Sequence, residues 1–217
     1  MKESTLITQT APDSEAAEAY RALRTSLVYA GLDRPLHAVV FAPPSPDEGR
    51  TAGVVANLGV VIARGGEKVI VADADLRRPR LHTLFAQENG EGLSEAVLQS
   101  EAPLPLHETG IEGLRLLTAG HPPLNAADLL ASQKMGALVR RLTQEAAIVL
   151  FTAPPVTAVT DAAALAAYCD GLVLTVRAGR TRRDRLTEAK AILEEWQVKT
   201  IGAVLLDAER KHLWQGY

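Results

Sequence analysis

Short runs of aliphatic and β-branched residues recur along the chain and predict buried strands. They lie at Leu36–Ala42, Lys68–Ala72, Leu114–Thr118, Ala147–Thr152, Gly171–Arg177 and Thr200–Leu206. Segments with the apolar period of a helix lie between most of them, at Ser14–Ala30, Thr51–Arg64, Asn125–Thr143, Asp161–Tyr168 and Arg182–Gln197. Because the strands are apolar on both faces and alternate with helices, the pattern predicts an α/β fold with a mostly parallel sheet between helix layers.

The rest of the pattern predicts one domain over residues 1–217, because no repeat and no long linker interrupts it. The stretch Pro79–Gly113 is less regular and predicts an excursion of helix and loop, and residues 1–13 and 208–217 are expected to be flexible ends. Ligands of such open sheets bind beyond the carboxyl ends of the strands. The segments that follow strands there are Pro43–Ala52, Asp73–Arg80 and Thr152–Asp161.

Composition narrows the class of protein further. Hydrophobic residues make up 47% of the chain and aromatic residues only 4%, so the core is expected to be aliphatic. A net charge of -3 gives no overall attraction to nucleic acid, and no nucleic-acid partner is expected. The one cysteine, Cys169, is expected to be buried and to act as a small hydrophobic residue. No apolar run is long enough for a signal peptide or a spanning helix, which favours a cytoplasmic protein.

The segment from the first predicted strand to the helix at Thr51 has the layout of a phosphate-binding loop. Such a loop needs glycines that let backbone N–H groups converge on phosphate, a lysine for the β and γ phosphates, and a hydroxyl for Mg²⁺. The pattern G-x-x-x-x-G-K-[ST] falls here on Pro44 to Thr51, with Pro44 for the first glycine and Arg50 for the lysine. Taken alone, the match does not separate a phosphate loop from an ordinary turn between strand and helix.

The following strand carries a more specific string, EKVIVADADLRRPRLHTLF. It resembles the bacterial tyrosine kinases of polysaccharide-export systems, whose second acidic motif, Asp-x-Asp-x-Arg, is matched by Asp73, Asp75 and Arg77. The string SEAAEAYRALRTSL resembles the family's Glu-x-x-Arg-x-x-Arg helix. The strings NAADLLASQKMGALVRRL, TAPPVTAVTDAAALA and DGLVLTVRAGRTRR follow in the family's order, so the resemblance covers nearly the whole chain.

The resemblance implies a three-layer fold of the P-loop NTPase type, ATP and Mg²⁺ as ligands, and tyrosine autophosphorylation. It also implies a membrane polysaccharide co-polymerase or adaptor as partner, a peripheral place at the inner face of the membrane through that partner, and a homo-oligomer or a hetero-oligomer with a family member. The implied residues are catalytic Asp73 and Asp75; nucleotide-binding Asp47, Glu48, Gly49, Arg50, Thr51 and Ala52; metal-binding Thr51 and Asp73; subunit-contacting Glu18, Arg21 and Arg24; and the phosphoacceptor Tyr217.

Several residues depart from the family pattern. Asp47 replaces a glycine and brings a negative charge beside the expected polyphosphate. Arg50 keeps the charge of the lysine but not its shape. Thr152 stands where the Walker B strand has the aspartate that organises Mg²⁺, and a neutral hydroxyl cannot replace that carboxylate. Leu206 takes the place of the base-recognising asparagine, unless a register shift of one residue brings Asp207 there.

These departures leave several interpretations open. Removal of one preorganised group from an active site costs about 2.7 to 4 kcal/mol, so the sequence favours a degenerate pseudokinase that regulates polysaccharide export through protein contacts. The alternatives are an active autokinase that uses Arg50, Asp73 and Asp75, and a relative of the partition and positioning ATPases, which carry a second lysine near Ser45.

Simpler roles compete for the same residues. Asp73 and Asp75 could cap the next segment and pair with Arg77 or Arg78, Glu18 and Arg21 could form a surface salt bridge, and Thr51 could be a helix N-cap. The basic run after the fifth predicted strand could grip phosphate or an acidic partner, or form a solvated face; it comprises Arg177, Arg180, Arg182, Arg183 and Arg185.

Overall fold

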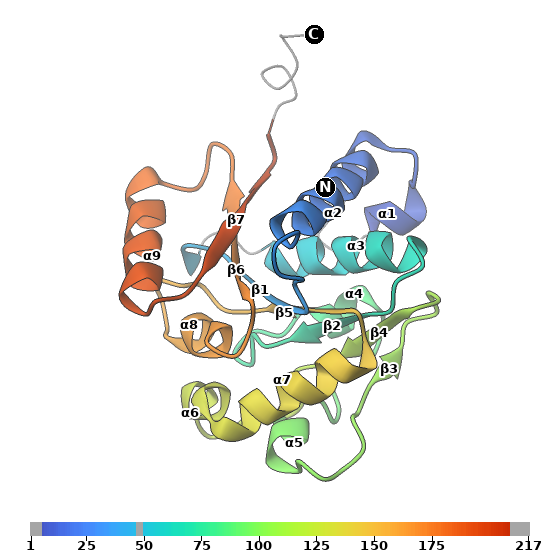
Figure 1. Cartoon of the computed structure of the whole chain (residues 1–217), viewed down its shortest axis with the longest axis vertical. Helices are drawn as coiled ribbons and strands as arrows, with labels where there is room; N and C mark the ends of the chain where they lie inside the picture. The colour runs from blue at the N-terminus through green and yellow to red at the C-terminus, as the bar shows by residue number, and fades with distance from the viewer. Residues whose placement is uncertain (1–5, 47–49, 209–217) are drawn as a thin grey trace, which may run out of the picture.

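The computed structural model describes residues 6–46 and 50–208 and contains a seven-stranded sheet (Figure 1). The strand order is β3-β4-β2-β5-β1-β6-β7, and every neighbouring pair is parallel except β3 and β4. The strands are β1 (Ala38–Ala42), β2 (Val69–Asp73), β3 (His107–Glu108), β4 (Leu114–Leu117), β5 (Ile148–Thr152), β6 (Gly171–Arg177) and β7 (Thr200–Leu206). The prediction of an α/β fold with a mostly parallel sheet is confirmed.

Helices cover both faces of this sheet (Figure 1). On one face lie α1 (Ile7–Thr10), α2 (Glu15–Ala30), α3 (Thr51–Arg64) and α4 (Leu81–Leu84). On the other lie α5 (Leu93–Leu98), α6 (Ala126–Ala131), α7 (Gln133–Glu145), α8 (Asp161–Ala166) and α9 (Arg183–Glu195). Together with the sheet they form the three layers that the sequence pattern predicts.

The core follows from the alternation of side chains along buried strands. In β1, Val39 and Phe41 belong to the hydrophobic cluster beneath α3, while Val40 and Ala42 belong to the cluster on the opposite face. All five residues of β1 are buried, as are those of β2 and β5, because helices lie on both sides. These central strands therefore form a rigid base for the residues at their carboxyl ends.

The segment Asn125–Thr143 differs from the prediction of a single helix. Two helices, α6 and α7, occupy it, because Ser132 has extended backbone angles of φ -73° and ψ 151°. Its hydroxyl accepts a hydrogen bond from the Met135 amide as the N-cap of α7. The irregular stretch expected at 79–113 contains α4, α5 and the short strand β3.

The start of the described chain also differs from the expectation of a flexible end at 1–13. Helix α1 packs on α3, and Thr8 is buried there: its amide and its hydroxyl donate to Asn57 Oδ1 at 3.0 Å and 2.9 Å. For residues 1–5 and 209–217, which lie outside the described residues, the expectation stays a prediction. Cys169, expected to be a buried small hydrophobic residue, is partly buried against the core, and this burial raises the pKa of its thiol.

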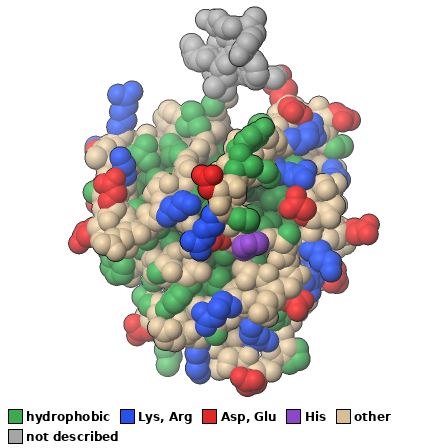
Figure 2. All heavy atoms as spheres, viewed as in Figure 1, with side chains coloured by type: hydrophobic (Ala, Val, Ile, Leu, Met, Phe, Trp, Pro, Cys, Tyr) green, Lys and Arg blue, Asp and Glu red, His purple; other side chains and the backbone are tan. Residues whose placement is uncertain are grey.

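Basic and acidic side chains are interspersed over the face drawn in Figure 2. Among the described residues, no helix is both long enough and apolar enough to cross a membrane.

Candidate functional site

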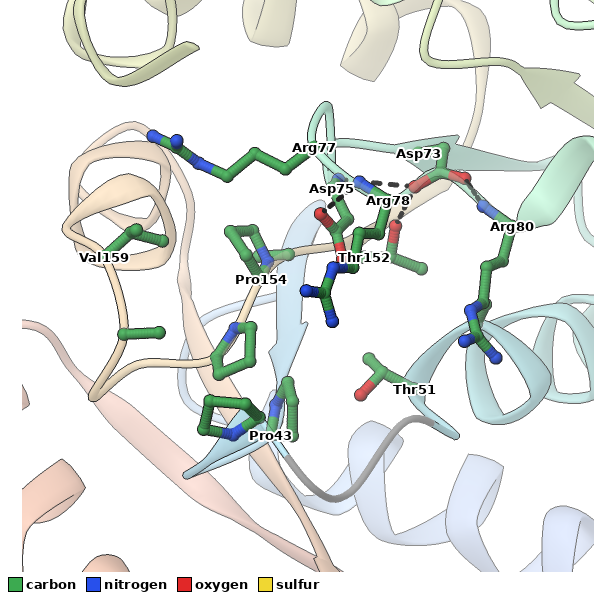
Figure 3. Close-up of a pocket in the computed structure, with 15 residues that line it drawn as sticks. Pro43, Thr51, Asp73, Asp75, Arg77, Arg78, Arg80, Thr152, Pro154 and Val159 are labelled. Carbon is green, nitrogen blue, oxygen red and sulfur yellow. Dashed lines mark hydrogen bonds between the residues drawn. The ribbon is translucent and has the colours of Figure 1, made fainter.

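The carboxyl ends of the central strands enclose a pocket of ≈ 220 Å³ (Figure 3). Strand β1 leads into Pro43, β2 ends at Asp73 and β5 ends at Thr152. The first turn of α3, with Thr51 and Ala52, forms a further wall. The three segments that follow strands in the sequence therefore meet around one pocket, as their place in a parallel sheet predicts.

Asp73 is buried at the base of this pocket and accepts hydrogen bonds on both carboxylate oxygens. Oδ1 accepts from the Thr152 hydroxyl at 2.7 Å and from the Asp75 amide at 3.3 Å. Oδ2 accepts from the amides of Arg80 and Leu81 at 2.7 Å and 2.8 Å. Burial raises the pKa of Asp73 above its usual value, and these hydrogen bonds oppose the rise. The carboxylate thus holds the start of α4 and the end of β5 in place.

Asp75 is the second carboxylate of the pocket and has fewer donors. Its Oδ1 accepts from the Arg78 amide at 3.0 Å, so Asp75 caps the turn that follows it. Burial raises the pKa of Asp75, and the neighbouring Asp73 carboxylate raises it further. The capping interpretation of the two aspartates fits this geometry.

Arg77 does not pair with either aspartate of its motif. Its guanidinium extends away from Asp75 in Figure 3 and binds both oxygens of Asp161, at 2.9 Å and 3.2 Å. Asp161 is fully buried at the start of α8, so this ion pair fixes the loop after β2 to the loop after β5. The expected pairing with Arg77 is wrong. Sequence reasoning missed Asp161, although an acidic residue in the first turn of a predicted helix was a usable signal.

The phosphate-loop segment is described only in part. Asp47, Glu48 and Gly49 lie outside the described residues, so their predicted contact with nucleotide stays a prediction. The hydroxyl of Thr51 lies 2.7 Å from the Thr175 hydroxyl. The N-cap of α3 is Arg50, which makes no side-chain capping bond, so the interpretation of Thr51 as N-cap is wrong.

Arg50 takes part in an ion-pair cluster at the ends of β6 and β7. Its Nη1 lies 2.9 Å from Asp207 Oδ1, and Arg177 Nη2 lies 2.9 Å from Asp207 Oδ2. The Arg50 charge also acts on Tyr20 of α2, whose pKa burial raises to about 12 against the opposing effect of that cation. Sequence reasoning named Asp207 only as a candidate for base recognition. Its partnership with Arg50 joins residues far apart in the chain, and no local pattern marks it.

The described polar residues of this pocket do not by themselves make a complete Mg²⁺ site. Magnesium in nucleotide sites is held by carboxylates, hydroxyls and water around phosphate oxygens. Here Asp73 accepts from four donors and the Thr51 hydroxyl is bonded to Thr175, which leaves Asp75 as the less occupied carboxylate. Within residues 6–46 and 50–208, no group of three or more His, Cys, Asp or Glu side chains could hold a metal ion.

Comparison with known proteins decides the family. The tyrosine-protein kinase YwqD of Bacillus subtilis is 36% identical over 214 residues, which cover 98% of this chain and 90% of YwqD. The chain belongs to the bacterial tyrosine-protein kinases. A putative tyrosine-protein kinase CapB of Staphylococcus aureus is 28% identical over 89% of this chain and 85% of CapB. A scan against protein-family models finds no match.

Solved structures agree with this membership. The kinase domain of the Escherichia coli tyrosine kinase ETK superimposes with a TM-score of 0.88 at 31% identity, covering 95% of this chain and 82% of that domain. The chimerical protein CapA2B2 gives a TM-score of 0.87 at 30% identity, over 92% of this chain and 88% of CapA2B2. The chain spans 27% of the full-length E. coli relative, Etk.

A more distant similarity concerns the fold alone. The septum site-determining protein MinD of Pyrococcus horikoshii, solved with Mg-ADP, gives a TM-score of 0.62 at 19% identity and covers 78% of this chain. Its fold and those of the kinases are of the P-loop NTPase type, which confirms that part of the fold prediction. The interpretation as a positioning ATPase gains no functional support from a likeness of this kind.

The family's Glu-x-x-Arg-x-x-Arg residues lie along α2. Arg21 Nε is 2.6 Å from Glu18 Oε2 in a surface salt bridge, and Arg24 Nη2 is 3.1 Å from Glu67 Oε1. Glu18 and Arg21 therefore form the simple pair that their spacing allows. A role in subunit contact stays a prediction.

The basic run and Tyr217 are the remaining candidate residues of this bacterial tyrosine kinase. In the basic run, Arg182 pairs with Asp184 and Arg185 with Glu188, which fits a solvated face. The predicted phosphoacceptor Tyr217 lies outside the described residues.

Proposed function

We propose that this bacterial tyrosine kinase has little phosphoryl-transfer activity and regulates polysaccharide synthesis or export through contacts with other proteins. Its proposed partner is a membrane polysaccharide co-polymerase or adaptor, which would bring the chain to the inner face of the membrane. The observation that carries the proposal is the hydrogen bond from Thr152 to Asp73, at the place where the resemblance implies a metal-organising aspartate.

The hydrogen bonding of Asp73 supports weak metal binding. With two donors on each of its oxygens, this carboxylate would have to give up hydrogen bonds before it could bind a cation. Thr152 is buried and neutral, and its hydroxyl proton points at Asp73 rather than at the pocket. ATP and Mg²⁺, the ligands implied by the resemblance, would therefore meet a site with little carboxylate charge at hand.

The surface of α2 supports a role in protein contacts. Val28, Tyr29 and Leu32 are large apolar side chains exposed by 55%, 67% and 68% near the end of this helix. A hollow of ≈ 190 Å³ adjoins them, lined in part by Arg24 and Val28. Apolar side chains beside a hollow, next to the charged row of Glu18, Arg21 and Arg24, are typical of a protein-binding surface.

The active autokinase remains the competing function, and one observation favours it. Asp75 lines the pocket with the side chains of Arg78 and Arg80, which in Figure 3 lie between the aspartates and Thr51. Cationic side chains there could compensate in part for the altered lysine.

One experiment separates the two functions. ATP and ADP, each with and without Mg²⁺, are titrated calorimetrically into the purified chain, and phosphotyrosine formation is followed in the same preparation. We expect weak binding with little dependence on Mg²⁺ and no phosphotyrosine. An Asp75→Asn variant serves as the control for any signal that arises in this pocket. Phosphotyrosine formed at a rate comparable to that of active relatives, and lost in this variant, would replace the proposal with the autokinase.

The contact role has its own test. Arg21→Glu and Val28→Asp alter the α2 surface, and Glu188→Lys on α9 is a matched change of charge elsewhere. We expect the α2 variants alone to lower the mass of the purified chain in light scattering or its binding to a co-purified partner. Identical assembly of all variants would remove α2 from the proposed contact surface.

A further inference from the structure

The Arg50–Asp207–Arg177 cluster joins the start of α3 to the ends of two strands. Asp207 binds Arg50 through Oδ1 and Arg177 through Oδ2, so a single carboxylate serves two guanidinium groups. Arg50 immediately precedes Thr51, a wall residue of the pocket, and stands at the lysine position of the phosphate-loop pattern. In this structure the cation of that position is bound to a carboxylate of the protein.

We infer that Asp207 is an internal competitor of polyphosphate: it holds Arg50 and thereby sets how tightly the pocket binds phosphate groups. The inference deepens the proposed function, because it rests on a nucleotide site that is present but weak. It assigns Asp207 as a residue that determines ligand affinity, in place of the base-recognising role considered from the sequence.

The scaffold holds Asp207 in a fixed position. It follows β7 directly, and β7 is paired with β6 up to the partners Arg177 and Leu206. Beyond that pair the Ala178 amide donates to the Leu206 carbonyl at 2.8 Å, which ties the two strand ends together. Asp207 has φ +56°, a left-handed conformation that aspartate tolerates better than most residues. The carboxylate is therefore presented by rigid elements rather than by a free side chain on a long loop.

The burial of the cluster gives the ion pair some strength. The Arg50 and Asp207 side chains are exposed by 28% and 38%, and that of Arg177 by 11%. A partly buried pair is screened less by salt than a fully exposed one. A phosphate group that approaches Arg50 has to displace a carboxylate already placed at hydrogen-bonding distance.

The second arginine makes the exchange feasible. When Arg50 turns to a phosphate, Asp207 keeps both of its hydrogen bonds to Arg177, from Nε at 3.0 Å and from Nη2 at 2.9 Å. The partly exposed Asp207 carboxylate is not left without a partner, so the exchange avoids the penalty of an unpaired charge. Arg177 thus stabilises Asp207 in both arrangements, and only Arg50 changes its partner.

The test compares the affinities of two ligands for the wild-type chain and for the Asp207→Asn variant. Inorganic pyrophosphate carries phosphate without a base, and ADP carries both. We expect both ligands to bind the variant more tightly than the wild type, by about fivefold, since Asn keeps the size of the side chain but removes the competing charge. Asp184→Asn is the control, because it removes a carboxylate paired with Arg182 in the exposed loop before α9. It should leave both affinities unchanged.

A double variant ties the gain to Arg50. In an Arg50→Gln background, Asp207→Asn should no longer tighten binding, because the competed cation is absent. Thermal unfolding of every variant shows whether the fold is retained. Three outcomes would overturn the inference. They are equal affinities of wild type and Asp207→Asn, no binding by either up to millimolar ligand, and a gain in affinity that persists in the Arg50→Gln background.

The remaining outcomes separate this inference from others. Weaker ADP binding with unchanged pyrophosphate binding would assign Asp207 to base recognition and overturn competition. The measurements need no turnover, so they stand apart from the test of the proposed function. Phosphotyrosine formation by the wild type would contradict the proposed function. The ratio of the affinities of Asp207→Asn and wild type would still test the role of Asp207.

Discussion

At the scale of single residues, the two aspartates of the Asp-x-Asp-x-Arg motif have different environments. Asp73 is buried with two donors on each oxygen, and Asp75 lines the pocket with the Arg78 amide as its donor. A sequence motif fixes their spacing but not these donors. Asp75 is therefore the better probe of the electrostatics of the pocket, because its charge can be removed with less damage to the fold.

Asp75→Asn is expected to stabilise the chain at neutral pH. Burial and the Asp73 carboxylate raise the pKa of Asp75 above 3.8, so the folded state binds this proton more tightly than the unfolded chain does. The resulting stability is fully present below pH 3.8 and is lost as the pH rises through the raised pKa. Asp75→Asn does not lose stability in this way as the pH rises. The difference between its thermal midpoint and that of the wild type should therefore shrink as the pH falls toward 3.8.

Asp184→Asn provides a control of opposite sign. The hydrogen bond with Arg182 lowers the pKa of Asp184, so this carboxylate contributes stability above its ordinary pKa and loses it on acidification. Removing it should give no gain at neutral pH. If the thermal midpoints of Asp75→Asn and wild type ran parallel over the whole pH range, the assigned environment of Asp75 would be wrong.

At the scale of elements, the sequence predicts the sheet well because strands buried on both faces are continuous apolar runs. The sequence predicts helix boundaries less well where a short polar residue ends one helix and begins the next. Ser132 falls between α6 and α7 without disturbing the apolar period, and its capping bond to the Met135 amide is a local choice that periodicity does not reveal. The burial of Thr8 against Asn57 depends on a contact across the fold, which a reading of the N-terminal segment alone could not supply.

Helix α3 offers a matched pair of glycines for a packing prediction. A Cβ atom at Gly59 would lie 2.7 Å from Val71 Cγ1 and 3.2 Å from Leu114 Cδ1, whereas one at Gly53 would meet nothing within 4 Å. We expect Gly59→Ala to lower the free energy of unfolding by about 1–3 kcal/mol through overpacking. Gly53→Ala should raise it by roughly 0.5–1 kcal/mol through helix propensity. Urea unfolding measures both, and equal effects would contradict this packing of α3 on β2.

The Arg77–Asp161 pair makes a prediction about the connection between two loops. Arg77→Met keeps the length of the side chain but leaves the fully buried Asp161 without this cation. We expect a loss of roughly 1–3 kcal/mol in the free energy of unfolding, which Asp161→Asn in the same chain should partly restore. Arg78→Met, on the next residue, is the control and should change stability little. Additive single effects in the double variant would show that the pair is not coupled.

At the scale of the whole molecule, the site is assembled from segments that only the sheet brings together. Their positions after strands were predictable, because parallel strands end at one edge. The partners were not: Arg50 meets Asp207, and Thr152 meets Asp73, across large separations in sequence. The sequence therefore shows which residues differ from the family pattern. The structure shows which side chains these residues contact.

Under the proposed function, this assembly predicts that Mg²⁺-dependent nucleotide binding is strengthened only by changes in separate segments. Thr152→Asp alone would place a second carboxylate beside the buried Asp73, where Thr152 Oγ1 is now 2.7 Å from its Oδ1. Like charges so close are unfavourable without a cation, so this single variant should unfold at a lower temperature. Arg50→Lys alone would supply an ammonium but no carboxylate for the metal.

The double variant Arg50→Lys, Thr152→Asp combines the two side chains that the resemblance to the family implies at these positions. We expect its ADP binding to be at least about tenfold tighter with Mg²⁺ than with a chelator, and its thermal midpoint to rise on addition of both ligands. Arg50→Lys with Thr152→Asn is the control, because asparagine has the size of aspartate without its charge. Calorimetric titration decides: equal Mg²⁺ dependence in the control would mean that the charge at residue 152 does not organise the metal, and Mg²⁺-dependent binding by either single variant would mean that the two segments act independently.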